Sequence, residues 1–505
     1  MPRTPEQAYA ELIRRMKERA LLGSCESLLG WDERTYMPRG GAGLRADQLA
    51  LLARLSHEML TSPPMGMLLD EVESSHLVRD RDSDVAANVR EIRRKYNRAV
   101  RLPKPLVEEL ARAATLGQQA WQEARARSDF AAFQPHLQRL VDLKREEAQA
   151  VGFKESAYDA LLDDYEPDET AASISKTFAA LRSELTPLIE GVVASRRRAP
   201  ADILTREFPI ERQRIFAQAA AAAIGFDFDS GRLDVTAHPF CSGLGPGDVR
   251  LTTRYNPHHF NEAFFGTLHE AGHGIYEQGL PAEHFGTPLG EACSLGIHES
   301  QSRTWENAVG RSSAFWEHWF PRARQVFIEA LRDVALEDWI LAINEIQPSL
   351  IRIEADEATY NLHIILRFEL EKALVGDELK PADLPDAWNQ LVRKFLGLKP
   401  KDDAQGCLQD IHWSAGLFGY FPTYTLGNLY AAQFMEQARA DLGNLDDAFR
   451  RGDFLCLKRW LNEKLHRHGK RYSAAELCLR VTGKPLSHQP LLRHLRAKCS
   501  SLYGV

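Results

Sequence analysis

The stretch FFGTLHEAGHGIY (residues 264–276) contains the HExxH motif His269–His273, which constrains this chain more than any other segment. Apolar residues precede and follow the motif at helical spacing, so we predict that it lies on an α-helix. Residues four apart share one face of a helix, so the imidazoles of His269 and His273 can reach a single metal ion. Glu270 projects beside them and can accept a proton from water on that ion.

A catalytic zinc site needs a third protein ligand and an open position for water. The run GIHESQS (residues 296–302) supplies two candidates. We predict that Glu299, 26 residues after His273, completes a His₂Glu site, because that distance allows a turn and a returning helix. His298 is the alternative ligand. Adjacent side chains on a helix point about 100° apart, so only one of the two can face the ion.

Helical patterns also cover most of the remaining chain, which predicts a mainly α fold. Thr4-Pro5-Glu6-Gln7 predicts a helix start, with Thr4 as the N-cap and Gln7 closing a capping box. Apolar residues then recur at helical spacing in several further segments. These segments are roughly 44–61, 83–100, 105–127, 129–151 and 170–197.

Residues 231–257 have a different character. Two β-prone runs, Leu233–Phe240 and Val249–Tyr255, flank a Gly/Pro turn at Gly243–Gly247. This pattern predicts a small β-hairpin or short sheet near the metal site. The chain shows no repeat and no linker, so we expect one helical catalytic body over residues 1–505. Within it, an N-terminal helical cap (1–200) and a metal-binding catalytic half (201–505) are the expected subdivision.

The composition is that of a globular protein that buries a large core. Of 505 residues, 44% are hydrophobic and 26% are charged, which excludes a disordered or collagen-like chain. The formal net charge of −7 gives no general attraction to nucleic acid. The seven cysteines form no CxxC pair, and no apolar run is long enough to cross a membrane. We therefore expect a cytoplasmic protein without nucleic-acid or membrane partners.

Several short motifs, in order along most of the chain, resemble the thermostable carboxypeptidase Taq family of metallocarboxypeptidases. Each motif is weak alone, and their joint order carries the resemblance. The matching segments are WDERTYMP (31–38) with Arg45 and Gln48, HPF (238–240), DVRLT (248–252), HEAGH (269–273), HESQ (298–301), IRIEAD (351–356) and GCLQDIHW (406–413).

The resemblance implies a mostly helical fold with the active site in a long groove. It implies removal of single residues from peptide C-termini, and therefore peptide substrates with a free carboxylate. It also implies one divalent metal ion, zinc first and cobalt second, and a homodimer. Glu299 as the third ligand agrees with the family pattern.

An exopeptidase must recognise a free α-carboxylate, and an Arg fork suits that group because it donates two parallel hydrogen bonds. Arg352 is the first candidate for this anchor, and the resemblance also points to it. The competing interpretation is that Arg352 pairs with Glu354 or Asp356. Arg250 is the second candidate, with an ion pair to Asp248 as its competing interpretation.

Further residues near the last motif could line the substrate site. His412, together with Tyr420 or Tyr424, could donate to the oxyanion or to the terminal carboxylate, and Tyr420 is preferred. His238 could line a subsite. Two carboxylates, Asp248 and Asp410, are candidates for orienting a ligand imidazole.

Two other functions remain open at this point. An oligopeptidase-type endopeptidase would use the same HExxH motif without a carboxylate anchor. A non-catalytic, metal-stabilised binding protein would close the site with a fourth protein ligand, for which His298 is available. If the HExxH motif is instead a chance match in a helical scaffold, the protein would bind no metal.

Overall fold

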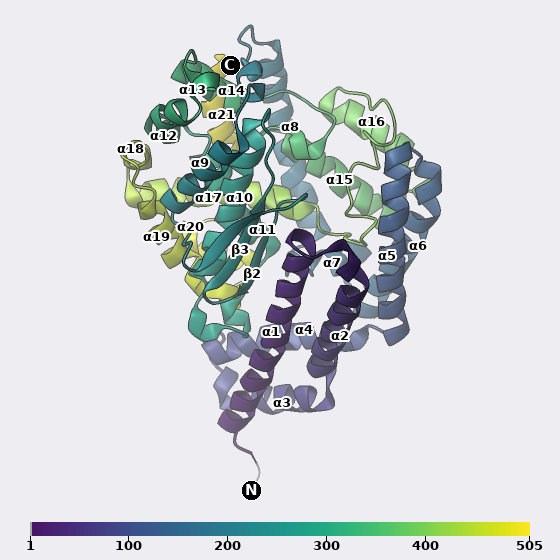
Figure 1. Cartoon of the computed structure of the whole chain (residues 1–505). Coiled ribbons are helices and arrows are strands. Elements are labelled where there is room, and N and C mark those ends of the chain that lie inside the picture. The colour runs from purple at the N-terminus through teal and green to yellow at the C-terminus, as the bar shows by residue number, and fades with distance from the viewer. Residues whose placement is uncertain (1–2) are drawn as a thin grey trace. The chain divides into compact units, whose positions relative to one another are not determined.

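A computed structural model describes residues 3–505, and the described chain is mainly helical with one small sheet (Figure 1). The prediction of a mainly α fold is confirmed. Contacts divide the chain into two compact units, each built from three separate stretches. The first unit takes the stretches up to Val100, Pro200–Ile343 and Ala431–Pro485, and the second takes Arg101–Ala199, Asn344–Tyr430 and Leu486–Val505. The functional subdivision near residue 200 stays a prediction.

The first unit contains the helices of the HExxH region and the N-terminal helices. The predicted capping box is present, since the Gln7 backbone N–H donates to Thr4 and the Gln7 side chain accepts from the Thr4 N–H. The helices of the first unit are α1 (Pro5–Thr35), α2 (Ala42–Thr61), α3 (Pro63–Glu73), α4 (Asp84–Arg101), α9 (Ile210–Ala223), α10 (Phe260–Gly279), α11 (Leu295–Arg303), α12 (Ser313–Val326), α13 (Ile328–Leu331), α14 (Leu336–Ile343), α18 (Leu445–Arg450), α19 (Leu455–Lys464) and α20 (Ala474–Thr482).

The sheet of the first unit has three strands in the order β1-β3-β2. Strand β3 (Asp248–Thr253) pairs parallel to β1 (Gly231–Val235) and antiparallel to β2 (Cys241–Gly245). The prediction of a short sheet is confirmed, but its bounds differ from the predicted runs. The run Leu233–Phe240 is not one strand, because Pro239 lies between β1 and β2 and has no backbone N–H to donate to a ladder.

An aromatic core fixes helix α10 within this unit. The Phe260 ring stacks on Phe264 and packs edge-on against Trp339. On the sheet side, a Cβ at Gly274 would lie 2.8 Å from the Leu251 side chain, so the absence of a side chain there lets α10 approach β3 closely. The HExxH helix is therefore held between an aromatic cluster and the sheet.

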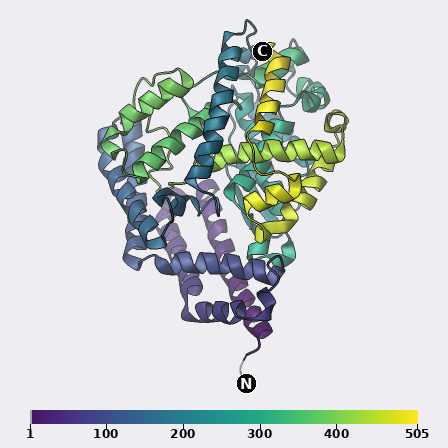
Figure 2. The same ribbon diagram turned by 180° about the vertical axis from the view of Figure 1, so that it is seen from behind.

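The second unit has helices and no strand among its described residues. Its helices are α5 (Lys104–Arg127), α6 (Phe130–Val151), α7 (Ala157–Leu162), α8 (Ala171–Ala194), α15 (Tyr360–Val375), α16 (Leu384–Leu396) and α21 (Gln489–Tyr503), and α17 (Pro422–Leu442) starts in this unit. The C-terminal helix α21 lies beside α8, as Figure 2 shows. Helix α15 is buried along most of its length and carries the fully buried Arg367 into the unit.

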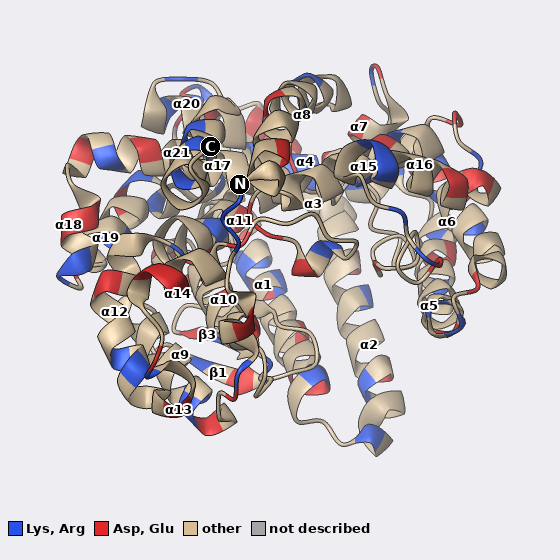
Figure 3. Cartoon of the chain, turned by 90° about the horizontal axis from the view of Figure 1, so that it is seen from above, with Lys and Arg blue, Asp and Glu red and all other residues tan. Residues whose placement is uncertain are grey.

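Many helices carry charged residues of both signs, as Figure 3 shows for α12 and α18. In α1, for example, Glu11 pairs with both Arg14 and Arg15 at helical spacing. Exposed pairs of this kind contribute about 0.2–0.5 kcal/mol each, so they support the helices only slightly. None of the described helices is both long enough and apolar enough to serve as a membrane span.

Candidate metal centre

Helices α10 and α11 bring three ligand atoms together. The Nε2 atoms of His269 and His273 lie 3.6 and 3.4 Å from Glu299 Oε2. The three residues form a group whose ligand atoms all lie within 4.8 Å of one another. Four ligands about 2.0–2.2 Å from a tetrahedral zinc ion are separated by about 3.3–3.6 Å. The spacing of these atoms therefore fits a zinc-sized ion.

A glycine inside the motif allows this approach of the two helices. A Cβ at Gly272 would lie 2.6 Å from the carbonyl oxygen of Gln301 and 2.6 Å from the Cα of Ser302. Real Cβ contacts are never this short, so any other residue at position 272 would push α11 away from α10. The glycine thus sets the distance at which Glu299 faces the two imidazoles.

A carboxylate that the sequence analysis did not identify orients His269. Glu306 lies in a π-helical segment, Thr304–Val309, which directly follows α11. Its Oε2 is 2.8 Å from His269 Nδ1, and Arg303 bridges it to Glu299, with Nε 2.6 Å from Glu299 Oε1 and Nη1 3.1 Å from Glu306 Oε2. A proton on Nδ1 leaves the lone pair of His269 on Nε2, which faces Glu299.

His298 does not point at the Nε2 atoms. Its Nδ1 is 2.6 Å from Nδ1 of His273, on the opposite edge of that ring, and its Nε2 is 2.8 Å from Glu277 Oε1. Glu299 and not His298 therefore faces the two imidazoles. Asp248 and Asp410, the carboxylates considered for contact with a ligand imidazole, bind arginines instead, and Glu306 occupies that position.

Burial and charge shift the pKa values of the site in different directions. Burial raises the pKa of Glu270 to about 7 and lowers that of His273 to about 3. Burial alone would also lower the pKa of His269, but Glu299 and Glu306 outweigh it and raise that pKa to about 8. Burial opposes ionisation of Glu299 too, yet Arg303 and His269 hold its pKa well below the usual range. A buried carboxyl group with a pKa near neutrality can both accept and release a proton.

The site residues proposed near the sheet are Arg250, Asp248 and His238. Arg250 donates two hydrogen bonds to Asp248, at 2.9 and 2.8 Å, and its guanidinium lies 4.3 Å from the Trp31 ring centroid. The ion pair considered for Arg250 is thus present. His238 is exposed in the segment between β1 and β2.

The carboxylate-anchor candidates of the second unit form a buried polar cluster. Arg352 donates to Asp410 Oδ1 through Nε at 2.9 Å and to the Tyr360 hydroxyl through Nη1 at 2.9 Å. Arg367 donates to the other oxygen of Asp410 at 2.6 Å. The partner of Arg352 is therefore Asp410, and the suggested pairing with Glu354 or Asp356 is not what the structure has.

His412 lies in the same cluster. Its Nε2 is 3.1 Å from the Tyr424 hydroxyl, and its ring packs 5.4 Å from that of Tyr420. Burial lowers the pKa of His412 to about 3, so the imidazole is neutral. The buried ionised groups of the cluster are then Arg352, Arg367 and Asp410, which leave one net positive charge.

Because Asp410 balances two arginines, Asp410→Asn should lower the free energy of unfolding by about 3–5 kcal/mol, the usual cost of leaving buried charges without their partner. Urea unfolding followed by circular dichroism would measure the change. Asp248→Asn is the matched control: it breaks the partly exposed pair with Arg250 and should cost about 1 kcal/mol or less. Equal losses in the two variants would contradict the view that Asp410 neutralises a buried pair.

Comparisons with known proteins agree over nearly the whole chain. The family model for Carboxypeptidase Taq (M32) metallopeptidase matches residues 11–499. Thermostable carboxypeptidase 1 of Thermus thermophilus is 51% identical over 99% of this chain and 100% of its own length, and Carboxypeptidase 1 of Bacillus subtilis is 39% identical over 99% of each. The crystal structure of the M32 carboxypeptidase from Deinococcus radiodurans R1 has a TM-score of 0.94 and 41% identity, covering 99% of this chain and 100% of that one. The chain therefore belongs to the carboxypeptidase Taq (M32) family and is a metallocarboxypeptidase, a hydrolase of peptide bonds.

Proposed function

We propose that this metallocarboxypeptidase releases single amino acids from the C-termini of peptides, using one divalent ion held by His269, His273 and Glu299. Zinc is the first choice of ion and cobalt the second. The observation that carries the proposal is the convergence of two Nε2 atoms and one carboxylate oxygen at the spacing of tetrahedral zinc ligands. When bound, zinc supplies Lewis acidity: it lowers the pKa of coordinated water to about 7 and polarises a carbonyl group.

Glu270 acts as the proton carrier of this proposal. Its carboxylate accepts a proton from the attacking water and later delivers it to the leaving amine. Its position in the motif, between the two histidines, and its pKa of about 7 both support this role. Hydrogen bonds to Glu306 and to the His298 carbonyl hold the two imidazoles with Nε2 toward Glu299.

Arg352 anchors the terminal carboxylate of the substrate. The cluster of Arg352, Arg367 and Asp410 is buried and has one net positive charge, which an incoming carboxylate would neutralise. Arg352 donates three of its five N–H groups to Asp410 and Tyr360. Among its contacts with the described residues, two N–H groups are left for a substrate carboxylate. An endopeptidase has no need for such a charge.

The other residues proposed to bind the substrate come from the sequence motifs that include or lie near these groups. His412 and Tyr420, next to the anchor cluster, are proposed to contact the terminal residue, with Tyr424 as the alternative to Tyr420. Arg250 is the alternative anchor for the terminal carboxylate, and His238 is proposed to line a subsite. The homodimer and the cytoplasmic location stay predictions.

Metal removal tests the proposal directly. After dialysis against a chelator, the protein should release no C-terminal residue from a short peptide, and one equivalent of zinc or cobalt should restore the release. Products are identified by mass spectrometry over time, because sequential loss of single residues distinguishes an exopeptidase from an internal cut. Full activity in verified metal-free protein would contradict the proposal, as would a closed site that binds metal without any hydrolysis.

A further inference from the structure

A chain of three side chains leads from the metal centre to a pocket in the first unit. His273 Nδ1 lies 2.6 Å from His298 Nδ1 and 3.1 Å from the carbonyl oxygen of His298. At the other end of the His298 ring, Nε2 lies 2.8 Å from Glu277 Oε1. Glu277 is on α10, four residues after His273, so the two share one helix face.

A single arrangement of protons makes each side-chain contact in this chain a hydrogen bond. If His273 binds an ion through Nε2, its proton is on Nδ1 and is donated toward His298. His298 Nδ1 then accepts, so the proton of His298 is on Nε2 and is donated to Glu277. Glu277, as a carboxylate, accepts only. The Glu277 carboxylate thus sets the tautomer of His298, whose Nδ1 joins the His298 carbonyl oxygen in accepting the proton on His273 Nδ1.

We propose that Glu277 is a positioning residue for the metal centre, which acts through His298 to hold Nε2 of His273 toward the ion. This inference rests on the proposed function, in which His273 is a metal ligand. His298, the sequence's alternative ligand, becomes the link between the two.

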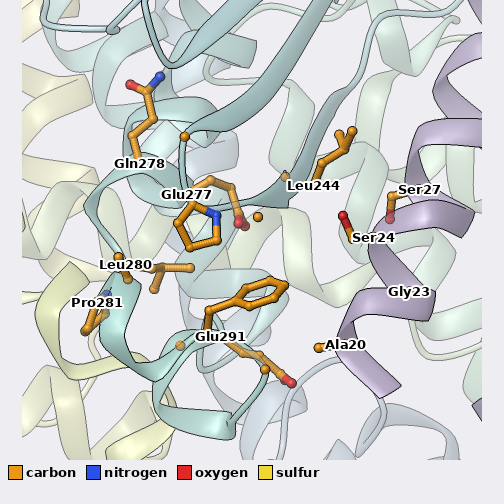
Figure 4. A pocket seen from close by; sticks show the side chains of 18 of the residues that line it. Ala20, Gly23, Ser24, Ser27, Leu244, Glu277, Gln278, Leu280, Pro281 and Glu291 are labelled. Carbon is orange, nitrogen blue, oxygen red and sulfur yellow. The ribbon is translucent and has the colours of Figure 1, made fainter. Parts of the chain in front are cut away.

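The surroundings of Glu277 leave room for its carboxylate. Its side chain projects into a pocket of about 330 Å³ lined by α1, the β2–β3 hairpin and the segment after α10, as Figure 4 shows. Its side chain is 25% exposed, so it avoids the cost of full burial. On the sheet side, a Cβ at Gly243 would lie 2.5 Å from Glu277 Oε2. Glycine at this position therefore leaves room for the carboxylate.

The zinc dissociation constant of the full-length protein, measured by competition with a chromophoric chelator, tests this role. Glu277→Ala should raise it about 10- to 100-fold, the usual effect of removing a hydrogen-bond partner of a ligand imidazole. Glu277→Gln retains an acceptor for the His298 N–H and should recover much of the affinity. Gln278→Ala is the matched control: this neighbour also lines the pocket, but it bonds to the backbone of Asp227.

Two further variants separate positioning from general stability. In a His298→Ala background, Glu277→Ala should change the zinc affinity no further, because the link is already broken. A residue with a merely structural role would instead add its own loss and lower the melting temperature of the metal-free protein. Gly243→Ala leaves Glu277 in place but displaces its carboxylate, so it should also weaken zinc binding.

Wild-type zinc affinity in Glu277→Ala, or additive losses in the double variant, would overturn the inference. If the proposed function itself is wrong, the experiments would give a different result. In that case the wild-type protein itself would bind no zinc in a one-to-one ratio, or would bind it without hydrolysing peptides.

Discussion

Glu270→Gln should lower kcat by about 10²- to 10⁴-fold, the usual contribution of a general base, which corresponds to about 3–5 kcal/mol of transition-state stabilisation. The variant should still fold and bind one equivalent of metal. Burial already raises the pKa of Glu270 to about 7, so a neutral amide of the same shape replaces a group that is partly protonated in the metal-free protein. The amide can neither accept the proton of the attacking water nor return it to the leaving amine.

The measurement combines steady-state kinetics on a short peptide with metal titration. Glu262→Gln is the matched control, since Glu262 is another carboxylate on α10 and pairs with Arg254 at the protein surface. It should retain kcat. If Glu270→Gln lost its metal together with its activity, the residue would be part of the metal site's structure and not the proton carrier.

The helix and the shared face of its two histidines were predictable because helical periodicity is local. The spacing of His269 and His273 places both imidazoles on one face whatever the rest of the protein does. The choice of Glu299 over His298 needed more, since the sequence left both open. The structure favours Glu299 because close contact at Gly272 sets how α11 is turned against α10, and such a contact between separate helices leaves no periodic signal.

The carboxylate that contacts His269 and the one proposed to position His273 were missed, although a helical signal was present. Glu306 follows Glu299 at a distance of seven residues, and Glu277 follows His273 at four, so helical spacing places each on a face with a proposed ligand. Spacing alone cannot tell such a carboxylate from a solvated one. The π-helical turn that carries Glu306 also changes the spacing rule at the point where it matters.

Ion pairs between residues far apart in the chain could not be predicted from the sequence for a similar reason. The partner of Arg352 is Asp410, 58 residues further along, and Arg367 shares that carboxylate from another helix. Local carboxylates such as Glu354 looked equally suitable in the sequence. Only the folded second unit shows that two cations, Arg352 and Arg367, share the single carboxylate of Asp410.

Arg352→Gln should lower kcat/KM for peptides with a free C-terminus by about 2–5 kcal/mol, the cost of removing one partner of a desolvated charge pair, or roughly 30- to several-thousand-fold. The fold should survive, because Arg367 still neutralises Asp410 in the variant. Arg352→Lys retains the charge but loses the planar fork, so it should recover only part of the rate.

The informative quantity is the ratio of kcat/KM for a peptide acid to that for its C-terminal amide. Wild-type protein should strongly prefer the acid, and Arg352→Gln should lose most of this preference by cleaving the acid as slowly as the amide. Arg250→Gln is the matched control, since Arg250 has its own carboxylate partner in Asp248 and stacks on Trp31. Should Arg250→Gln lose the preference while Arg352→Gln retains it, Arg250 would be the anchor. A wild-type protein that cleaves the amide as fast as the acid would have no anchor at all, and the net positive charge around Asp410 would then need a different explanation.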